Sequence, residues 1–183
     1  MTDYDFERIS ILVVEDSLFL RSLLINSLRI LGVGRVYAVD HGGEAIHFLQ
    51  KVKTDPMAVG CQQIDIVMTN WQMSPVDGMM LLRWIRRHKD SPDRFVPVIM
   101  ISAYSEPKRV EEARELGVTE FLTKPFTIQA IGAKLVSIIE RQRQFVHTKD
   151  YFGPDRRRRI APITFEDRRK LTDKSPGVEI VRG

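Results

Sequence analysis

Residues 64–78 read IDIVMTNWQMSPVDG, and this stretch decides the fold. The largely apolar run over residues 64–69 is typical of a strand buried on both faces, as strands of parallel sheets are. Asn70 ends the run, and Pro75 and Gly78 mark the turn that follows. The pattern therefore indicates a buried strand whose last residue opens onto a loop at the edge of a sheet.

Four further apolar runs have the length of buried strands, and they alternate with segments of helical periodicity. The strand-like runs cover residues 9–14, 35–39, 96–101 and 120–123, and the helical segments begin near Ser17, Gly43, Met79, Pro107 and Ile128. Residues 51–63 are expected to form a loop, because Pro56 and Gly60 interrupt the helical pattern. Strands that alternate with helices pair in parallel through right-handed crossovers. The sequence thus predicts an α/β fold: a flavodoxin-like (βα)5 doubly wound parallel sheet of order 2-1-3-4-5, followed by an irregular C-terminal tail.

Length and composition indicate one globular domain with an extension. The 183 residues are 43% apolar, enough for a core, and the predicted boundary divides residues 1–144 from a tail at 145–183 that is largely disordered without a ligand. The single cysteine, Cys61, rules out an internal disulfide and suits a reducing cytosol. No apolar run approaches the roughly 20 residues of a membrane span. We therefore expect a cytoplasmic protein without membrane insertion.

The positive charge is concentrated in the tail. Residues 150–183 contain nine Lys/Arg and six Asp/Glu, and so carry +3 of the net charge of +4. A basic tail indicates an anionic partner, although charge alone is equally compatible with a solvated linker.

Polar residues stand where the predicted strands end. In doubly wound sheets, functional sites lie beyond the carboxyl ends of the strands. This rule selects Glu15, Asp16, Asn70, Ser102 and Lys124 as the candidate site.

These landmarks together resemble a known family. Residues 8–143 are similar to CheY-like receiver domains of bacterial response regulators. In the first half of the chain, the matching features are the acid pair Glu15-Asp16, Asn70 at the phosphoacceptor position, and Met73 and Val76-Asp77-Gly78 in the next loop. In the second half they are Ser102-Ala103 at the hydroxyl switch, Phe121 at the aromatic switch and Lys124-Pro125-Phe126. The resemblance implies a pocket in which two acids and an aspartate hold Mg²⁺ while the aspartate accepts a phosphoryl group.

Asn70 departs from that pattern, because a neutral carboxamide is a far poorer nucleophile than a carboxylate. We expect phosphorylation to be lost and Mg²⁺ to bind at most weakly, through Glu15, Asp16 and the main-chain oxygen near Gln72. Lys124 is expected to form an internal ion pair with Asp16. Alternatively, the acids and the lysine are now purely structural. Asn70 is either the natural residue of a receiver that has lost its phosphoacceptor or an engineered substitution that traps an inactive state. The sequence is compatible with both.

The tail contains a repeated unit in which an aromatic residue precedes Asp-Arg-Arg. Residues 151–159 read YFGPDRRRR, and residues 165–170 read FEDRRK. Arginine forks bind phosphates and the O6/N7 edge of guanine, aromatic rings stack on bases, and aspartate can accept from the N1–H and N2–H₂ groups of guanine. The combination favours a guanine nucleotide with phosphates, such as cyclic di-GMP.

The arrangement also resembles the CheY-like cyclic di-GMP effectors (the Cle group), which are receivers with an arginine-rich extension. The predicted ligand-binding residues are Tyr151, Asp155, Arg156, Arg157, Arg158, Arg159, Asp167, Arg168 and Arg169. The alternative role of Asp155 and Asp167 is helix capping or charge balance, and that of Phe152 and Phe165 is docking onto the receiver.

The resemblance implies a non-enzymatic signalling adaptor that binds cyclic di-GMP and then engages a protein partner such as the flagellar motor switch, with recruitment to the motor or the cell pole. One alternative is a receiver-like module whose basic tail contacts nucleic acid. The tail's six acids and the lack of a helix-turn-helix pattern argue against it. The other is a protein-interaction module in which the tail is a tether. No base, nucleophile and oxyanion site converge, so we expect no enzyme.

Overall fold

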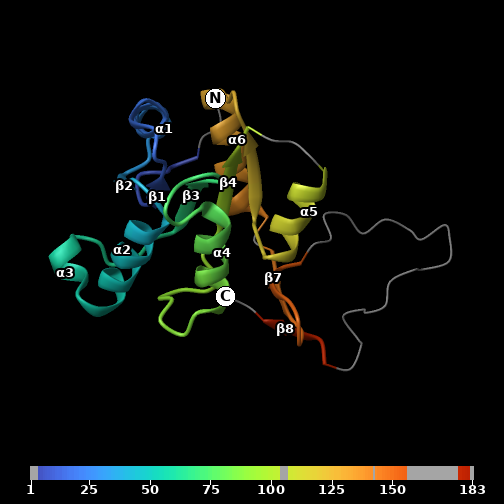
Figure 1. The fold of residues 1–183 in the computed structure, drawn as a ribbon. Helices are drawn as coiled ribbons and strands as arrows, with labels where there is room; N and C mark the ends of the chain where they lie inside the picture. Colours follow the sequence, from blue (N-terminus) through green and yellow to red (C-terminus); the bar gives the residue numbers. More distant parts are fainter. Residues whose placement is uncertain (1–3, 104–106, 142, 156–176, 182–183) are drawn as a thin grey trace.

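Short apolar strands alternate with helices in the computed structural model, which describes residues 4–103, 107–141, 143–155 and 177–181 (Figure 1). In chain order the elements are β1 (Ser10–Val14), α1 (Leu18–Ile30), β2 (Arg35–Val39), α2 (Gly42–Thr54), α3 (Pro56–Val59), β3 (Ile66–Asn70), α4 (Gly78–Arg87), β4 (Val98–Ser102), α5 (Pro107–Glu115), β5 (Glu120–Thr123), α6 (Ile128–Glu140), β6 (Phe145–His147), β7 (Phe152–Pro154) and β8 (Glu179–Val181). Among the helices of these residues, none has the length and apolarity that crossing a bilayer requires.

The predicted parallel sheet is confirmed. Strands β1 to β5 pair in the order β2-β1-β3-β4-β5, and every pairing is parallel. All residues of β1, β3 and β4 are buried, as expected for central strands that helices cover on both sides. Because parallel strands end at one edge, this order brings the carboxyl ends of β1, β3, β4 and β5 together.

Alternate residues of the strands enter two separate cores. Leu12, Val67 and Met100 face α2, α4 and α5, whereas Ile11, Met68 and Ile99 face α1 and α6. A period of two along each strand divides the apolar side chains between the faces. The sheet is therefore doubly wound, as Figure 1 shows.

The loop predicted over residues 51–63 is partly helical instead. Helix α2 continues to Thr54, and the single turn α3 follows. Asp55 caps this turn by accepting a hydrogen bond from the Ala58 amide, and Pro56 occupies a first-turn position that needs no N–H donor. Gly60 then ends the turn at φ 62°, where a residue without a Cβ is favoured.

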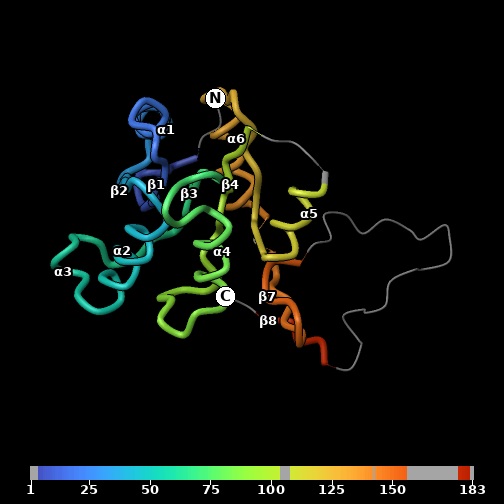
Figure 2. The backbone as a smooth tube through the Cα atoms, viewed as in Figure 1, coloured from blue at the N-terminus to red at the C-terminus, as the bar shows by residue number. Residues whose placement is uncertain are grey.

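The tail, predicted to be irregular, contributes a second sheet. Strands β6, β7 and β8 pair antiparallel in the order β7-β6-β8 (Figure 2). Each strand has three residues, which is too short for a periodic signal in the sequence. Contact with the five-stranded α/β part of the chain therefore stabilises this sheet, since Phe145 and Phe152 are buried against Phe95.

A buried arginine on α4 organises this contact. Arg86 has no exposed surface, and its guanidinium donates hydrogen bonds to the main-chain oxygens of Arg94, Val96 and Gly117 at 2.7–3.0 Å. The guanidinium also lies 5.3 Å from the ring centre of Phe145. Burial lowers the pKa of Arg86 to about 10, so the side chain stays charged at neutral pH. The buried cation of α4 therefore contacts both the turns before β4 and β5 and the Phe145 ring of β6.

Two glycines allow the second sheet to approach closely. A Cβ on Gly117 would lie 2.8 Å from the Phe152 oxygen, and a Cβ on Gly153 would lie 2.6 Å from the Gly117 Cα. The two backbones therefore meet without intervening side chains. Arg94 covers Phe152 from the solvent side, with its guanidinium carbon 3.4 Å from the ring centre.

We predict that Arg86→Met lowers the free energy of unfolding by about 3 kcal/mol, because up to three buried carbonyls lose their donor and each loss costs roughly 1 kcal/mol or more. Urea denaturation followed by circular dichroism measures the change. Arg83→Met, on an exposed position of the same helix, is the matched control and should change stability by less than about 0.5 kcal/mol. Equal effects of the two substitutions would contradict a structural role of the buried guanidinium.

Candidate functional site

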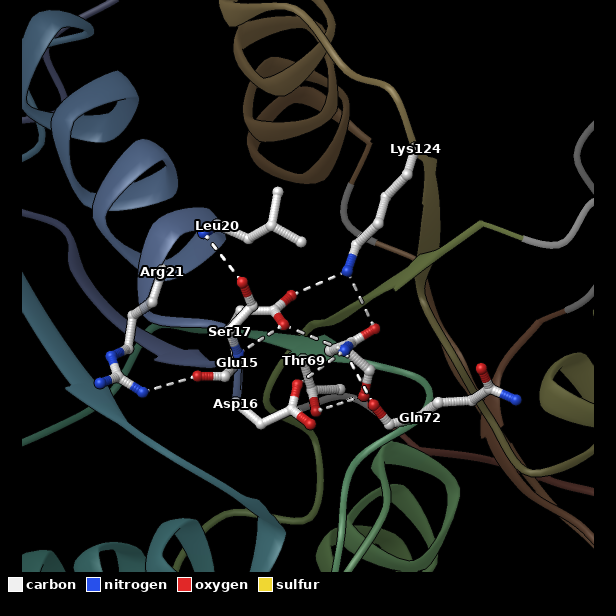
Figure 3. A network of polar contacts seen from close by, with 9 residues as sticks. Glu15, Asp16, Ser17, Leu20, Arg21, Thr69, Gln72 and Lys124 are labelled. Atoms are coloured by element: carbon white, nitrogen blue, oxygen red, sulfur yellow. Dashed lines mark hydrogen bonds and ion pairs between the residues drawn. The ribbon is translucent and has the colours of Figure 1, made fainter.

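The five residues that the sequence selected lie at one edge of the sheet. Glu15 and Asp16 follow β1, Asn70 and Ser102 end β3 and β4, and Lys124 follows β5. Four of them join one polar network, in which Figure 3 shows the amine of Lys124 and the carboxylate of Glu15 facing each other. Ser102 is buried beside this network, and its main-chain oxygen accepts a hydrogen bond from the Lys124 amide.

Asn70 is the centre of the network. Its Nδ2 lies 3.1 Å from Glu15 Oε1, 3.3 Å from Asp16 Oδ1 and 2.8 Å from the main-chain oxygen of Gln72. On the other side, its Oδ1 accepts a hydrogen bond of 3.2 Å from Lys124 Nζ. The NH₂ group of the amide thus faces oxygen acceptors, and its oxygen faces the ammonium group of Lys124. These contacts define which way the Asn70 amide points.

Lys124 pairs with Glu15, so the prediction that it pairs with Asp16 is wrong. The distance from Lys124 Nζ to Glu15 Oε2 is 2.9 Å, and the Glu15 side chain has no exposed surface. Asp16 is exposed, so water can solvate its carboxylate. A buried carboxylate needs the counter-charge far more than an exposed one does, and the lysine satisfies that need.

The arrangement does not fit a resident magnesium ion. Three oxygens that could ligate Mg²⁺, from Glu15, Asp16 and Gln72, already accept hydrogen bonds from the Asn70 amide. An aspartate at this position would supply a third carboxylate, whereas the amide supplies a donor. Within the described residues there is no group of three or more His, Cys, Asp or Glu side chains that could hold a metal. The weak Mg²⁺ binding expected through these oxygens stays a prediction.

Two residues that sequence reasoning missed support the pocket. Arg21 of α1 donates a hydrogen bond of 2.8 Å to the main-chain oxygen of Glu15 and also pairs with Asp40. Thr69 Oγ1 donates to the main-chain oxygen of Asn70 at 3.1 Å. Both lie on elements whose periodicity indicates core packing, so only the assembled fold reveals these contacts.

The aromatic switch position lies next to the pocket. Phe121 of β5 is partly buried and stacks against Trp71, with ring centres 6.4 Å apart. Trp71 directly follows Asn70, so the aromatic switch position contacts the residue next to the acceptor position. The Lys124–Pro125 peptide bond is cis.

The structure describes two of the residues predicted to bind cyclic di-GMP. Tyr151 is buried, and its hydroxyl donates to the main-chain oxygen of Pro154 at 2.7 Å. The amide of Asp155 donates to the main-chain oxygen of Gln144. The other predicted residues lie outside the described part of the chain: Arg156, Arg157, Arg158, Arg159, Asp167, Arg168 and Arg169. The docking role considered for Phe152 is the one observed. The ligand-binding roles stay predictions.

A parallel sheet of this order, with an acid pair, a lysine and an acceptor position at its carboxyl edge, defines a receiver of the two-component type. The response regulator receiver domain family matches residues 11–136. The chain therefore belongs to this family.

Curated relatives cover the same part of the chain. Chemotaxis protein CheY-3 of Vibrio cholerae is 33% identical over 135 residues, which are 74% of this chain and 95% of that protein. Chemotaxis protein CheY of Pseudomonas aeruginosa is 31% identical over 131 residues, 72% of this chain and 96% of that protein. The chain is thus a receiver-domain signalling protein related to the CheY chemotaxis regulators.

Solved structures support the fold. CheY4 of Vibrio cholerae aligns with a TM-score of 0.60 at 22% identity, over 71% of this chain and 98% of that chain. The receiver domain of the histidine kinase CKI1 from Arabidopsis thaliana, complexed with Mg²⁺ and BeF₃⁻, aligns with a TM-score of 0.59 at 25% identity, over 70% and 89%.

We predict that the chain incorporates no phosphate from acetyl phosphate and Mg²⁺, and that Asn70→Asp gains both Mg²⁺ binding and a phosphoryl adduct. The substitution replaces the amide donor with a carboxylate ligand and nucleophile. Mass spectrometry measures the adduct, and Trp71 fluorescence follows Mg²⁺ titration. Asn70→Ser, which also removes the amide but adds no charge, is the control. A stoichiometric, base-labile adduct at residue 70 of the unaltered chain would contradict the prediction.

Proposed function

We propose that this chain is a non-enzymatic signalling adaptor whose receiver pocket takes no phosphoryl group and whose input is cyclic di-GMP, bound by the C-terminal segment. The contacts of Asn70 are the observation that carries the first half. Its amide donates hydrogen bonds to the acid pair that a cation would otherwise bridge, and it offers no charged nucleophile. A signal must then enter elsewhere.

The chemistry of the C-terminal segment supports a guanine messenger. Four consecutive arginines follow Asp155, and a second Asp-Arg-Arg unit follows at residues 167–169. Guanidinium groups bind phosphates and the guanine O6/N7 edge, and a carboxylate can accept from guanine N–H groups. A ligand with two guanines and two phosphates uses all of these groups at once.

The second sheet supports the proposal by holding both ends of the arginine-rich segment. Strand β7 ends at Pro154, β8 begins at Glu179, and both pair with β6. The two strands that flank the segment are therefore both held on β6 before any ligand binds. Flanking strands that are already anchored lower the entropic cost of bringing the two Asp-Arg-Arg units to one ligand.

The relatives indicate the output. Proteins named as chemotaxis regulators are 31–33% identical to the receiver part, so a flagellar motor component is the proposed partner, with the chain acting in the cytoplasm. If cyclic di-GMP orders the surface that the partner binds, ligand and partner must strengthen each other's binding equally.

We expect isothermal titration of the full chain with cyclic di-GMP to show binding, and Arg157→Ala and Arg169→Ala each to weaken it, because each removes a guanidinium that contacts phosphate or guanine. Neither substitution should lower the free energy of unfolding of the receiver. Lys51→Ala removes an exposed positive charge from α2 and is the control, with unchanged affinity.

If calorimetry detects no heat of binding at high micromolar cyclic di-GMP, the proposal that cyclic di-GMP is the ligand is refuted. Binding to duplex DNA whose affinity falls steeply with salt, together with indifference to cyclic di-GMP, would instead favour a nucleic-acid partner.

A further inference from the structure

The residue before α2 caps this helix with a ring nitrogen. His41 Nδ1 accepts hydrogen bonds from the main-chain amides of Gly43 at 3.1 Å and of Glu44 at 3.4 Å. Such a cap satisfies amides that the first turn of a helix leaves without partners. Because a main-chain amide can only donate, Nδ1 is the unprotonated nitrogen, and the proton of the neutral ring is on Nε2. The cap therefore requires a neutral imidazole.

The other histidines are placed differently. The chain has four histidines, and all of them lie in the described segments. In His88 and His147, Nδ1 lies 3.6 Å and 3.4 Å from a carboxylate oxygen, which stabilises the protonated ring. His47 is an exposed residue of α2. Of the four, only His41 holds one ring nitrogen against two main-chain donors, so its protonation opposes the folded arrangement.

Protonation of His41 removes the cap and adds a charge of the wrong sign. Imidazolium carries a hydrogen on both ring nitrogens, so Nδ1 can no longer accept. The new positive charge stands at the N-terminus of α2, where the helix dipole is already positive. Loss of an N-cap typically lowers the folding equilibrium constant about fivefold. Histidine changes its charge between about pH 5 and pH 8, so modest acidification reaches this cap.

The acids of the adjoining segments do not replace the lost cap. They are Asp16 after β1, Asp40 after β2, Glu44 of α2 and Asp77 before α4. Each carboxylate already accepts a hydrogen bond or an ion pair from another group, including the Arg21 guanidinium and the Asn70 amide. All but Asp77 are exposed, and an exposed carboxylate typically changes such an equilibrium only about twofold. The cap and the helix dipole therefore set the sign: stability is lost as the pH falls.

The start of α2 is bonded to the loop that follows Asn70. The Gly42 amide donates to the main-chain oxygen of Val76 at 3.0 Å, and a Cβ on Gly42 would lie 2.8 Å from that oxygen. The same loop contains Gln72, whose main-chain oxygen accepts from the Asn70 amide at 2.8 Å. The capped end of α2 therefore holds one side of the loop whose other side belongs to the receiver pocket.

A second connection leads from the turn before α2 to the acid pair of the pocket. Asp40 directly precedes His41 and pairs with Arg21, which donates to the main-chain oxygen of Glu15 at 2.8 Å. The Asp40 amide donates to Glu44 Oε2 at 2.9 Å, which joins this turn to the first turn of α2. The residues around His41 thus contact the pocket from two directions.

We propose that His41 is a pH-sensitive cap: the neutral ring holds the start of α2 against the loop that follows Asn70, and protonation releases both. The stability that depends on the neutral ring is present above the pH range in which His41 titrates and is lost as the pH falls through it. The device does not depend on cyclic di-GMP. It gives a receiver whose acceptor position is a carboxamide another way to change the loop beside its pocket.

The test compares the full chain with His41→Asn at about pH 7.5 and about pH 5. Asparagine is among the best N-cap residues and does not titrate, so this variant keeps a cap and lacks only the charge change. His47→Asn, at an exposed position of the same helix, is the matched control. Urea unfolding followed by circular dichroism gives the folding equilibrium constant of each protein at both pH values.

We expect acidification to lower the folding equilibrium constant of the unaltered chain and of His47→Asn about threefold more than that of His41→Asn. In NMR spectra of the unaltered chain, the amide signals of Gly42, Gly43 and Gln72 should shift together with the titration of the His41 ring. In His41→Asn these amide signals should not follow that titration.

The outcomes separate the cap from its connection to the pocket. An equal pH dependence of all three proteins, or cap amides that do not follow the His41 ring, would refute the pH-sensitive cap. Shifts confined to Gly43 and Glu44, with unchanged signals of Gln72 and of the Asn70 side-chain amide, would refute the connection to the loop. Neither result bears on the proposed function, because none of these measurements uses cyclic di-GMP.

Discussion

The buried carboxylate of Glu15 must be paired and hydrogen-bonded, and this requirement determines the polar contacts at the carboxyl edge of the sheet. The Glu15 side chain has no exposed surface, and a charge without water is costly unless it is paired and hydrogen-bonded. Lys124 supplies the counter-charge, and the Asn70 amide supplies a further donor. The parallel order of β1, β3 and β5 brings these three groups together from distant parts of the chain. The pocket therefore keeps a connected polar network, although Asn70 stands at the position of the acceptor carboxylate.

The opposite edge depends on a buried cation. Arg86 satisfies three main-chain oxygens at the turns that lead into β4 and β5, and Phe145 covers it. Helix α4 thus runs from the loop that follows Asn70 to the docking site of the second sheet. The same helix contacts both regions, so the receiver pocket and the second sheet share one structural element.

Several features could be read from sequence because their signals are local. Apolar runs of strand length, the alternation with helices and the polar residues at strand ends predict the sheet order and the pocket residues. The second sheet and the α3 turn could not be read in this way. Three-residue strands and a single helical turn carry no period, and β6 and β7 exist because Phe145 and Phe152 have a surface to bury against.

The sequence by itself determined that this is a receiver fold with a carboxamide at the acceptor position and a basic C-terminal segment, since identity and spacing of residues suffice for each. Only the tertiary structure decided that Lys124 pairs with Glu15 rather than with Asp16, and that Asn70 Nδ2 faces oxygens of Glu15, Asp16 and Gln72. It also decided that a cleft forms where the second sheet meets the strand starts. These outcomes depend on burial and distance between residues far apart in the chain, and no local pattern encodes either quantity.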